Sequence, residues 1–211
     1  MIKQAGRPRA ADLEARNNNL IDTATQLFLK HGYGKVSLEL IAREAHVAVR
    51  TIYVKFGGKS GLFKAVLIAN RDKFMAPQAL EADNRPLKEV VGELSVHFLD
   101  MITAPAALEV QRMVIAESRT DPEVAQSFFD AGPRQTRDMM YKLFARPENR
   151  AQLRDDVSLD QLPVFLTNCI LGDPFSRLLF DPAAQPREDV LNNLNQRLEL
   201  FYRSVLKDPA A

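Results

Sequence analysis

Three helical segments separated by very short breaks lie near the N-terminus, and they constrain the fold of this chain most. Apolar residues recur at three- and four-residue spacings over 11–31, and a second helical segment begins after Ser37. This spacing is typical of amphipathic helices. A third segment over about 48–54 follows, with only "AHV" (residues 45–47) before it, so a tight turn must join the last two helices. This arrangement predicts a helix-turn-helix unit.

The residues of this unit divide into a buried set and an exposed set. Gly32 suits the left-handed end of the first helix, Tyr33 can pack back over its last turn, and the Ser37 hydroxyl can cap the second helix. The expected core consists of Leu27, Phe28, Ile41, Ala42, Val47, Ile52 and Phe56. The side chains left outside that core are long, basic, hydroxylated or aromatic, as a groove-reading helix requires: Val49, Arg50, Thr51, Tyr53 and Lys55.

Helical spacing also dominates the rest of the chain. The expected helices span 59–76, 86–103, 105–118, 122–145, 159–180 and 187–206. Pro174 falls inside one of them and should kink or split it after Gly172, because proline has no backbone N–H to donate. The sequence therefore predicts an all-α fold with a flexible basic arm over 1–10, a helix-turn-helix domain over 11–58 and a larger helical domain over 59–211.

The charge of the chain is unevenly distributed. The formal net charge is only +1, yet residues 1–60 hold ten Lys or Arg against five Asp or Glu. Such a basic segment is typical of a surface that meets a polyanion, but also of a solvated charged surface. The single cysteine, Cys169, excludes an internal disulfide. With no signal peptide and no apolar run of about 18 residues, the sequence predicts a cytoplasmic protein without a membrane partner.

The triplet Gly-Lys-Ser at 58–60 matches the end of a nucleotide-binding phosphate loop, but the match is incomplete. That loop requires a glycine five residues before Gly58, where Tyr53 stands. Without it the backbone cannot easily wrap its N–H groups around a diphosphate. A helix that begins near Lys59 would instead direct its free N–H groups and its dipole toward an anion. We interpret the stretch as a contact for the backbone phosphates of a duplex.

Residues 20–63 resemble the N-terminal DNA-binding domain of TetR-type transcriptional regulators. That family typically shows A-x-x-L-F-x-x-x-G-Y-x-x-[TV]-[ST], followed by I-A-x-x-A-G-V-S-x-G-[TS]-[LI]-Y-x-[HY]-F-x-x-K-x-x-L. The matches run without a gap and are Ala24, Leu27, Phe28, Gly32, Tyr33, Val36, Ser37, Ile41, Ala42, Ala45, Val47, Thr51, Ile52, Tyr53, Phe56, Lys59 and Leu62. The later half, around "RMVIAESRTDPEVAQSFFDAGP", loosely resembles the AefR-like regulatory domains of the same family.

The resemblance implies a homodimer whose N-terminal domains bind a palindromic operator in double-stranded DNA. Most such regulators are repressors that a small-molecule effector releases, and no cofactor or metal is implied. By position, the residues implied to hold phosphates are Ser37, Thr51, Tyr53, Lys55 and Lys59, and those facing base edges are Val49, Arg50 and Thr51. Arg7 and Arg9 could place an extended arm in the minor groove or belong to a solubilising tail.

Four residues depart from the family pattern. His46 replaces a turn glycine, so a left-handed backbone costs more there. Ala48 replaces a capping serine, at a cost of about 1 kcal/mol of helix stability. Arg50 replaces a small residue and can either bond O6 and N7 of a guanine or hold a phosphate. Lys55 replaces a His or Tyr. None of these changes removes the module.

In this family the last two long helices form the dimer interface, and the larger domain holds the effector pocket. The expected interface residues form an apolar stripe, which packing within one subunit could also use: Leu162, Phe165, Leu166, Cys169, Leu191, Leu194, Leu198, Phe201 and Val205. The expected pocket residues are apolar or adaptable side chains and one histidine, although core packing is commoner for such residues: Phe74, His97, Phe98, Met101, Met113, Phe128, Met140 and Phe144.

Two other classes of protein remain open. An enzyme would need a nucleophile with a base, paired carboxylates or a metal set. Cys169 has no histidine near it in sequence, and Glu93 with His97 has no evident third metal ligand. A helical scaffold or protein-binding module would not need the hydroxyl, aromatic and basic residues around the helix-turn-helix. The sequence therefore predicts a ligand-responsive, sequence-specific DNA-binding regulator, with the scaffold as its alternative.

Overall fold

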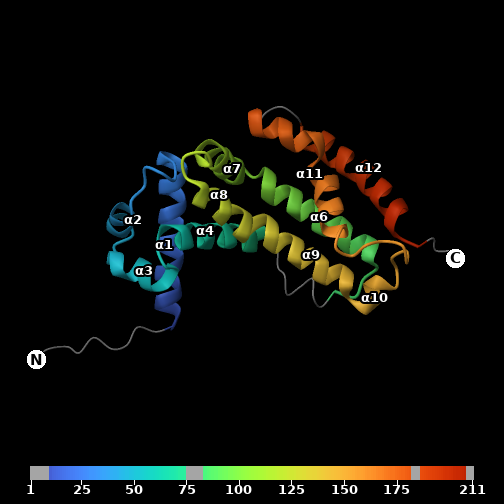
Figure 1. Cartoon of the computed structure of the whole chain (residues 1–211), viewed down its shortest axis with the longest axis horizontal. Helices are drawn as coiled ribbons and strands as arrows, with labels where there is room; N and C mark the ends of the chain where they lie inside the picture. Colours follow the sequence, from blue (N-terminus) through green and yellow to red (C-terminus); the bar gives the residue numbers. More distant parts are fainter. Residues whose placement is uncertain (1–9, 75–82, 182–185, 208–211) are drawn as a thin grey trace, which may run out of the picture.

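The computed structural model describes residues 10–74, 83–181 and 186–207, and within them the regular structure is helical, apart from one isolated bridge between Leu153 and Leu206 (Figure 1). The helices are α1 (Ala10–His31), α2 (Leu38–Glu44), α3 (Val49–Phe56), α4 (Lys59–Phe74), α6 (Leu87–Thr103), α7 (Pro105–Glu117), α8 (Pro122–Phe129), η1 (Asp130–Arg134), α9 (Gln135–Ala145), α10 (Pro147–Arg150), α11 (Leu162–Phe180) and α12 (Arg187–Val205). The expected all-α fold is confirmed. No described helix is long and apolar enough to cross a membrane.

The helices follow the expected spans with two differences. A π-helical turn, η1, interrupts the helix expected over 122–145. Pro133 lies in that turn and has no N–H for the usual α-helical acceptor, so the helix widens locally. The short helix α10 was not expected, because four residues are too few to show helical spacing. The last two residues of the helix expected over 59–76 lie outside the described residues.

α4 connects the two parts of the molecule. The helix-turn-helix unit of α1–α3 lies at one end and α12 lies toward the other, while α4 runs from the first part into the second (Figure 1). α4 contacts α1 and α3 and also α6, α8 and η1. A displacement of this helix would therefore change its contacts in both parts.

The first of two apolar clusters contains residues from both sides of the domain boundary expected between residues 58 and 59. It joins α1–α4 and includes Val110 and Val114 of α7 and Val124 of α8. Leu62 and Phe63 of α4 are fully buried in it. The boundary expected between residues 58 and 59 thus lies within one continuous core, because the helix-turn-helix unit is too small to bury its own apolar face.

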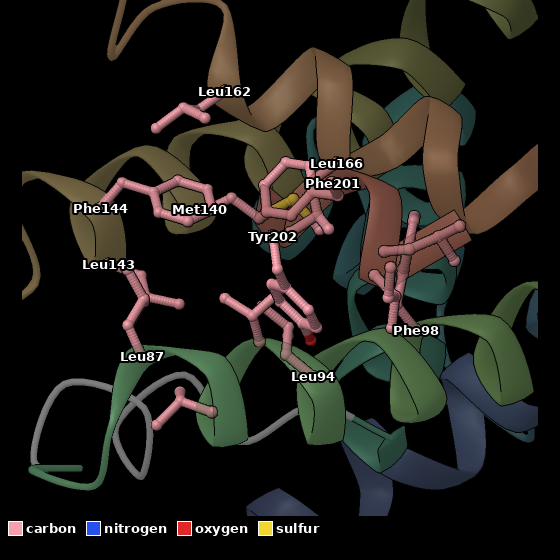
Figure 2. Close-up of a cluster of buried hydrophobic side chains, with 14 of the residues drawn as sticks. Leu87, Leu94, Phe98, Met140, Leu143, Phe144, Leu162, Leu166, Phe201 and Tyr202 are labelled. Carbon is pink, nitrogen blue, oxygen red and sulfur yellow. The ribbon is translucent and has the colours of Figure 1, made fainter. Parts of the chain in front are cut away.

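The second cluster fills the space between α6, α9, α11 and α12. Figure 2 shows Met140 and Phe144 of α9 meeting Phe201 of α12 there. Tyr202 points toward α6, and its hydroxyl donates a 3.1 Å hydrogen bond to the Lys88 carbonyl (Figure 2). α12 is therefore fixed to α6 by a polar contact as well as by apolar packing.

The kink expected in α11 is confirmed at Gly172, whose φ of 52° and ψ of −170° are not helical. The N–H that would bond the Ile170 carbonyl is missing because residue 174 is proline. Arg197 of α12 supplies the replacement. Its Nε donates to the Cys169 carbonyl at 2.5 Å and its guanidinium donates to the Ile170 carbonyl at 3.2 Å.

Candidate nucleic-acid interface and ligand cavity

The helix expected to read DNA, α3, is anchored by one side chain and open elsewhere. Ile52 is fully buried, whereas Tyr53 and Val54 are 57% and 75% exposed. The five predicted residues of this helix are exposed or half-buried: Val49, Arg50, Thr51, Tyr53 and Lys55. The sequence did not single out Val54, since an apolar residue is usually assigned to a core. Because α3 lies at the end of the molecule, its outer face is accessible to a duplex (Figure 1).

The turn before α3 has the two destabilising features that its sequence predicts, a left-handed residue and a helix without a side-chain cap. His46 adopts a left-handed φ of 55°, a conformation that a side chain with a Cβ disfavours. Ala48 occupies the N-cap position of α3 without a side-chain hydrogen bond. The backbone still closes the turn, because the Val47 N–H donates to the Ala42 carbonyl at 2.9 Å. The turn is thus held by backbone contacts and by packing.

Ser37 caps the N-terminus of α2 as predicted. Its hydroxyl oxygen accepts a 3.2 Å hydrogen bond from the Leu40 N–H, which is the expected N-cap contact. The hydroxyl proton remains available to an outside acceptor, and the residue is exposed. Arg7 and Arg9 lie outside the described residues, so the minor-groove arm stays a prediction.

The two lysines implied to hold phosphates differ in their surroundings. Lys55 is exposed and donates to the side-chain oxygen of Asn17 in α1. Lys59, in the first turn of α4, is half-buried, with its Nζ 4.2 Å from the centroid of the Tyr33 ring. Burial lowers the pKa of Lys59 below its ordinary value. The Lys59 ammonium also lies 3.5 Å from the Gly34 carbonyl, so it is directed toward the loop between α1 and α2.

The same loop is also held by a contact with the larger domain. Gly32 takes the left-handed conformation predicted for it, and Tyr33 is buried against Phe28 and Phe63 with ring centroids 5.3 and 5.2 Å away. Burial raises the pKa of the Tyr33 hydroxyl, as do the nearby carboxylates. Glu117 of α7 accepts a hydrogen bond from the Gly34 N–H. The segment that follows the C-terminal end of α1 therefore connects the two parts of the protein.

A cavity of about 340 Å³ lies where α1, α4, α6, α7, α8, η1, α9 and α11 meet. Its wall is mainly apolar and includes Val66 of α4, Phe98 and Met101 of α6, Val110 of α7 and Phe175 of α11. The volume is within the range of about 300–1,000 Å³ that is usual for small-molecule sites. Because α1 and α4 contribute to the wall, a ligand here would touch the unit that carries α3.

Three of the predicted pocket residues line this cavity, namely Phe98, Met101 and Phe128. Met140 and Phe144 do not, because both are fully buried in the second core. Met113 packs against the first core, and His97 is exposed. The side chain of Phe74 lies outside the described part of the chain. Helical spacing alone could not separate a cavity wall from a core, since both use the same apolar residues.

Polar groups of the cavity wall were missed by the sequence analysis. Arg71 of α4 and Thr136 and Arg137 of α9 line the cavity, together with Asp22 and Lys73. Arg71 is only 15% exposed although it carries a charge. Nothing in the local sequence distinguishes these residues from those of a solvated helix face, because their burial depends on contacts between distant helices.

The predicted interface stripe is divided between core and surface. Six of its residues are buried in the second core of the single chain and leave little surface for another subunit: Leu162, Leu166, Leu194, Leu198, Phe201 and Val205. Phe165 is 41% exposed, and Cys169 and Leu191 are half-buried. Phe180 and Leu200, which were not predicted, are 91% and 63% exposed on the same two helices.

The residues considered for enzyme or metal chemistry, Cys169 and Glu93, lie in surroundings that do not favour those roles. Burial raises the pKa of the Cys169 thiol, which disfavours the reactive thiolate. Glu93 forms an ion pair with Arg85 at 2.7 Å. Among the described residues, no three His, Cys, Asp or Glu side chains are grouped as metal ligands would be.

Comparison with known proteins agrees with this arrangement over both parts of the chain. Residues 20–66 match the bacterial regulatory proteins of the tetR family, and residues 89–197 match the C-terminal domain of AefR-like transcriptional repressors. The HTH-type transcriptional repressor ComR of Escherichia coli K12 is 38% identical over 74 residues, 35% of this chain and 33% of ComR. The HTH-type transcriptional regulator SrpR of Pseudomonas putida is 28% identical over 112 residues, 52% of this chain and 50% of SrpR. The chain thus spans half or less of these curated relatives.

Solved structures extend the similarity to nearly the whole fold. NalD, the secondary repressor of the MexAB-OprM multidrug efflux pump in Pseudomonas aeruginosa, aligns with a TM-score of 0.66 and 26% identity over 93% of this chain and 100% of its own. A TetR transcriptional regulator from Agrobacterium tumefaciens aligns with a TM-score of 0.70 and 19% identity over 92% and 95%. Since the AefR-like match alone covers more than half of the chain, the protein belongs to the TetR family of transcriptional regulators, with an AefR-like C-terminal domain.

Proposed function

We propose that the protein is a repressor that binds a near-palindromic operator as a homodimer and leaves it when a small, largely apolar molecule occupies the cavity. The observation that carries this proposal is the exposed outer face of α3, which presents Arg50, Tyr53 and Lys55 at the free end of the molecule. A helix with basic, aromatic and hydroxyl side chains can contact both phosphates and base edges in the major groove.

The apolar side chains left exposed on α11 and α12 support the dimer. Phe165 and Phe180 of α11 and Leu200 of α12 are each more than 40% exposed. A second subunit that packs these faces together would bury them, as obligate interfaces do. This placement moves the proposed interface from the buried part of the predicted stripe to the outer faces of the same two helices.

The position of the cavity supports control by a ligand. Ile21 and Thr25 of α1 and Val66 of α4 share its wall with side chains from α6, α7 and α11. A molecule that fills it better in one arrangement of α1 and α4 than in another would shift the equilibrium between them. Because the two reading helices of a dimer must enter grooves about 34 Å apart or a multiple of that, a modest shift lowers DNA affinity.

Selection of fragmented genomic DNA by the purified full chain at near-physiological salt tests the proposal. We expect a few near-palindromic sites to be enriched, with binding that weakens steeply as salt rises. The variant Tyr53→Ala should lose most of this enrichment, whereas Tyr141→Ala, which removes an exposed tyrosine of α9, should retain it. If no fragment is retained above random DNA, the proposal fails.

A further inference from the structure

We infer that the cavity selects amphiphilic acids, meaning molecules with an apolar or aromatic body and one anionic group. This inference rests on the proposed function, because it names the class of effector that the same cavity would take. It is carried by two arginines and one buried hydroxyl that line the cavity, whose wall is mainly apolar.

The charges that line the cavity are unbalanced. The wall has three cations, Arg71, Lys73 and Arg137, and one carboxylate, Asp22, among its described residues. Lys73 and Asp22 are 4.0 Å apart and largely exposed, so they form a solvated pair near the surface. Arg71 is paired with the Asp72 carboxylate at 2.9 Å. The positive charge left without an ion pair among the described residues therefore belongs to Arg137, and an anionic group would neutralise it.

Arg71 is held in place but keeps hydrogen-bonding capacity. Its guanidinium has five N–H donors. Two of its nitrogens donate to the Asp72 carboxylate at 3.0 and 2.9 Å, and the third donates to the side-chain oxygen of Gln135. These contacts use three donors, so two N–H groups remain for a ligand. The bond to Gln135 also places the Arg71 head beside the first turn of α9.

The next two residues of that turn provide further polar groups on the wall of the same cavity. Thr136 is only 3% exposed, lines the cavity, and its hydroxyl has no hydrogen-bond partner within 10–74, 83–181 or 186–207. Arg137 is half-buried and lines the cavity without an ion pair to any described residue. A buried polar group without a partner is costly. A carboxylate or acidic phenol would satisfy the Thr136 hydroxyl and both arginines.

The rest of the wall specifies the body of the ligand. Phe98, Phe128 and Phe175 contribute aromatic surface, and Met101 and Leu171 contribute aliphatic surface. A small inorganic anion would leave this surface uncovered, whereas a cationic amphiphile would lie against two arginines. The wall therefore fits an acid with an extended apolar portion.

The test uses two sets of matched probes that differ only in the polar group. The first set is octanoate, 1-octanol and octylammonium, and the second is 2-naphthoate, 2-naphthylmethanol and 2-naphthylmethylammonium. Binding to the purified full chain is measured by calorimetry. We expect at least one acid to bind about tenfold or more tightly than its alcohol, because hydrogen bonds between charged groups are strong. The ammonium probes should bind more weakly still.

Three variants locate the selectivity. Arg137→Gln and Thr136→Val should each reduce the affinity for the acid while leaving the affinity for the alcohol within about twofold. Arg134→Gln is the matched control, because Arg134 lies one turn before Arg137, is largely exposed and does not line the cavity. The inference is overturned if no acid binds, if the alcohol or ammonium binds as tightly, or if both Arg137→Gln and Thr136→Val keep the full preference for the acid.

Release of a retained DNA fragment is measured with the same probes, so that the two proposals can fail separately. An acid that binds without releasing DNA supports the selectivity of the cavity and defeats its role as the effector site. Release by the alcohols or ammonium probes alone supports the effector site and defeats its selectivity for acids.

Discussion

The side-chain carboxylate of Glu117, in the last turn of α7, accepts a 2.6 Å hydrogen bond from the backbone N–H of Gly34. Gly34 lies 83 residues earlier in the chain, in the loop that leads from α1 into α2. The ammonium of Lys59, a residue of α4, contacts the same loop and lies 3.5 Å from the Gly34 carbonyl. One carboxylate therefore links the larger domain to the segment that precedes the reading helices.

We expect Glu117→Ala to lower the stability of the protein by about 1 kcal/mol, because the Gly34 N–H loses a charged acceptor. DNA affinity should fall as well, since the loop would no longer be tied to α7. Thermal unfolding and titration with a retained DNA fragment measure the two effects. Glu117→Gln keeps an acceptor oxygen and should lie between the parent and the Ala variant. Identical melting and DNA affinity of Glu117→Ala and the parent would contradict this role.

Gly32→Ala should destabilise the protein more than Gly57→Ala. Both glycines have left-handed φ values, 82° and 76°, so a Cβ costs about 1–2 kcal/mol at either position. At Gly32 the added Cβ would also lie 2.6 Å from a carboxylate oxygen of Glu117, so this carboxylate would have to move and weaken its hydrogen bond with the Gly34 N–H, whereas at Gly57 the Cβ meets nothing within 4 Å. Urea unfolding of the two variants isolates the extra contact. The added cost should disappear in the double variant Gly32→Ala with Glu117→Ala, and an equal cost in both single variants would refute it.

Ala48→Ser should stabilise the protein by about 1 kcal/mol, because α3 has no side-chain cap and a serine hydroxyl can accept from a free N–H. The reverse experiment is Ser37→Ala, which removes the observed cap of α2 and should cost a similar amount. Denaturant unfolding measures both. A neutral Ala48→Ser variant beside a destabilised Ser37→Ala variant would show that the left-handed His46 prevents the capping geometry.

Arg50→Ala should weaken binding to a retained DNA site by about 1–3 kcal/mol, since Arg50 is exposed on α3 and has no hydrogen bond or ion pair to a described residue. Binding titrations at several salt concentrations, with repeated site selection, reveal its role. Relaxed preference at one base pair indicates contact with a base, and a uniform loss with a smaller salt slope indicates contact with a phosphate. Lys142→Ala removes an exposed charge of α9 and serves as the control. Unchanged affinity of Arg50→Ala would exclude both roles.

Arg197→Ala should destabilise the protein by about 2 kcal/mol, because the carbonyls of Cys169 and Ile170 would lose their donors at the kink of α11. Arg203→Ala removes an exposed arginine from the same helix and should change stability little. Thermal unfolding distinguishes the two variants. Equal melting temperatures would mean that water replaces the guanidinium at no cost.

Local signals predicted the helix-turn-helix unit almost residue by residue. The left-handed Gly32, the Ser37 cap, the uncapped Ala48 and the strained His46 all depend on neighbours within a few positions, so the sequence contains the information that decides them. The break at Gly172 was predictable for the same reason, since a proline two residues later removes a donor. The enzyme alternative is excluded because the chain belongs to a family of transcriptional regulators.

Contacts between distant helices could not be predicted in the same way. Met140 and Phe98 both have apolar side chains buried in the second core, yet of the two only Phe98 also lines the cavity. Arg71 and Arg137 look like surface residues in the sequence, because their burial depends on how α4 packs against η1 and meets the start of α9. The interface stripe was divided for the same reason, because burial of Phe201 depends on which helices cover α12.

The continuous first core limits how this protein can be used to build hybrid regulators. A chimaera that took only residues 1–58 would leave Phe28 and Tyr33 without the ring of Phe63, and it would lose the cover that Val110, Val114 and Val124 supply. A graft would have to carry α4 and recreate a matching surface on α7 and α8. New operator specificity is therefore obtained more safely by changing the exposed residues of α3 than by exchanging the whole N-terminal module.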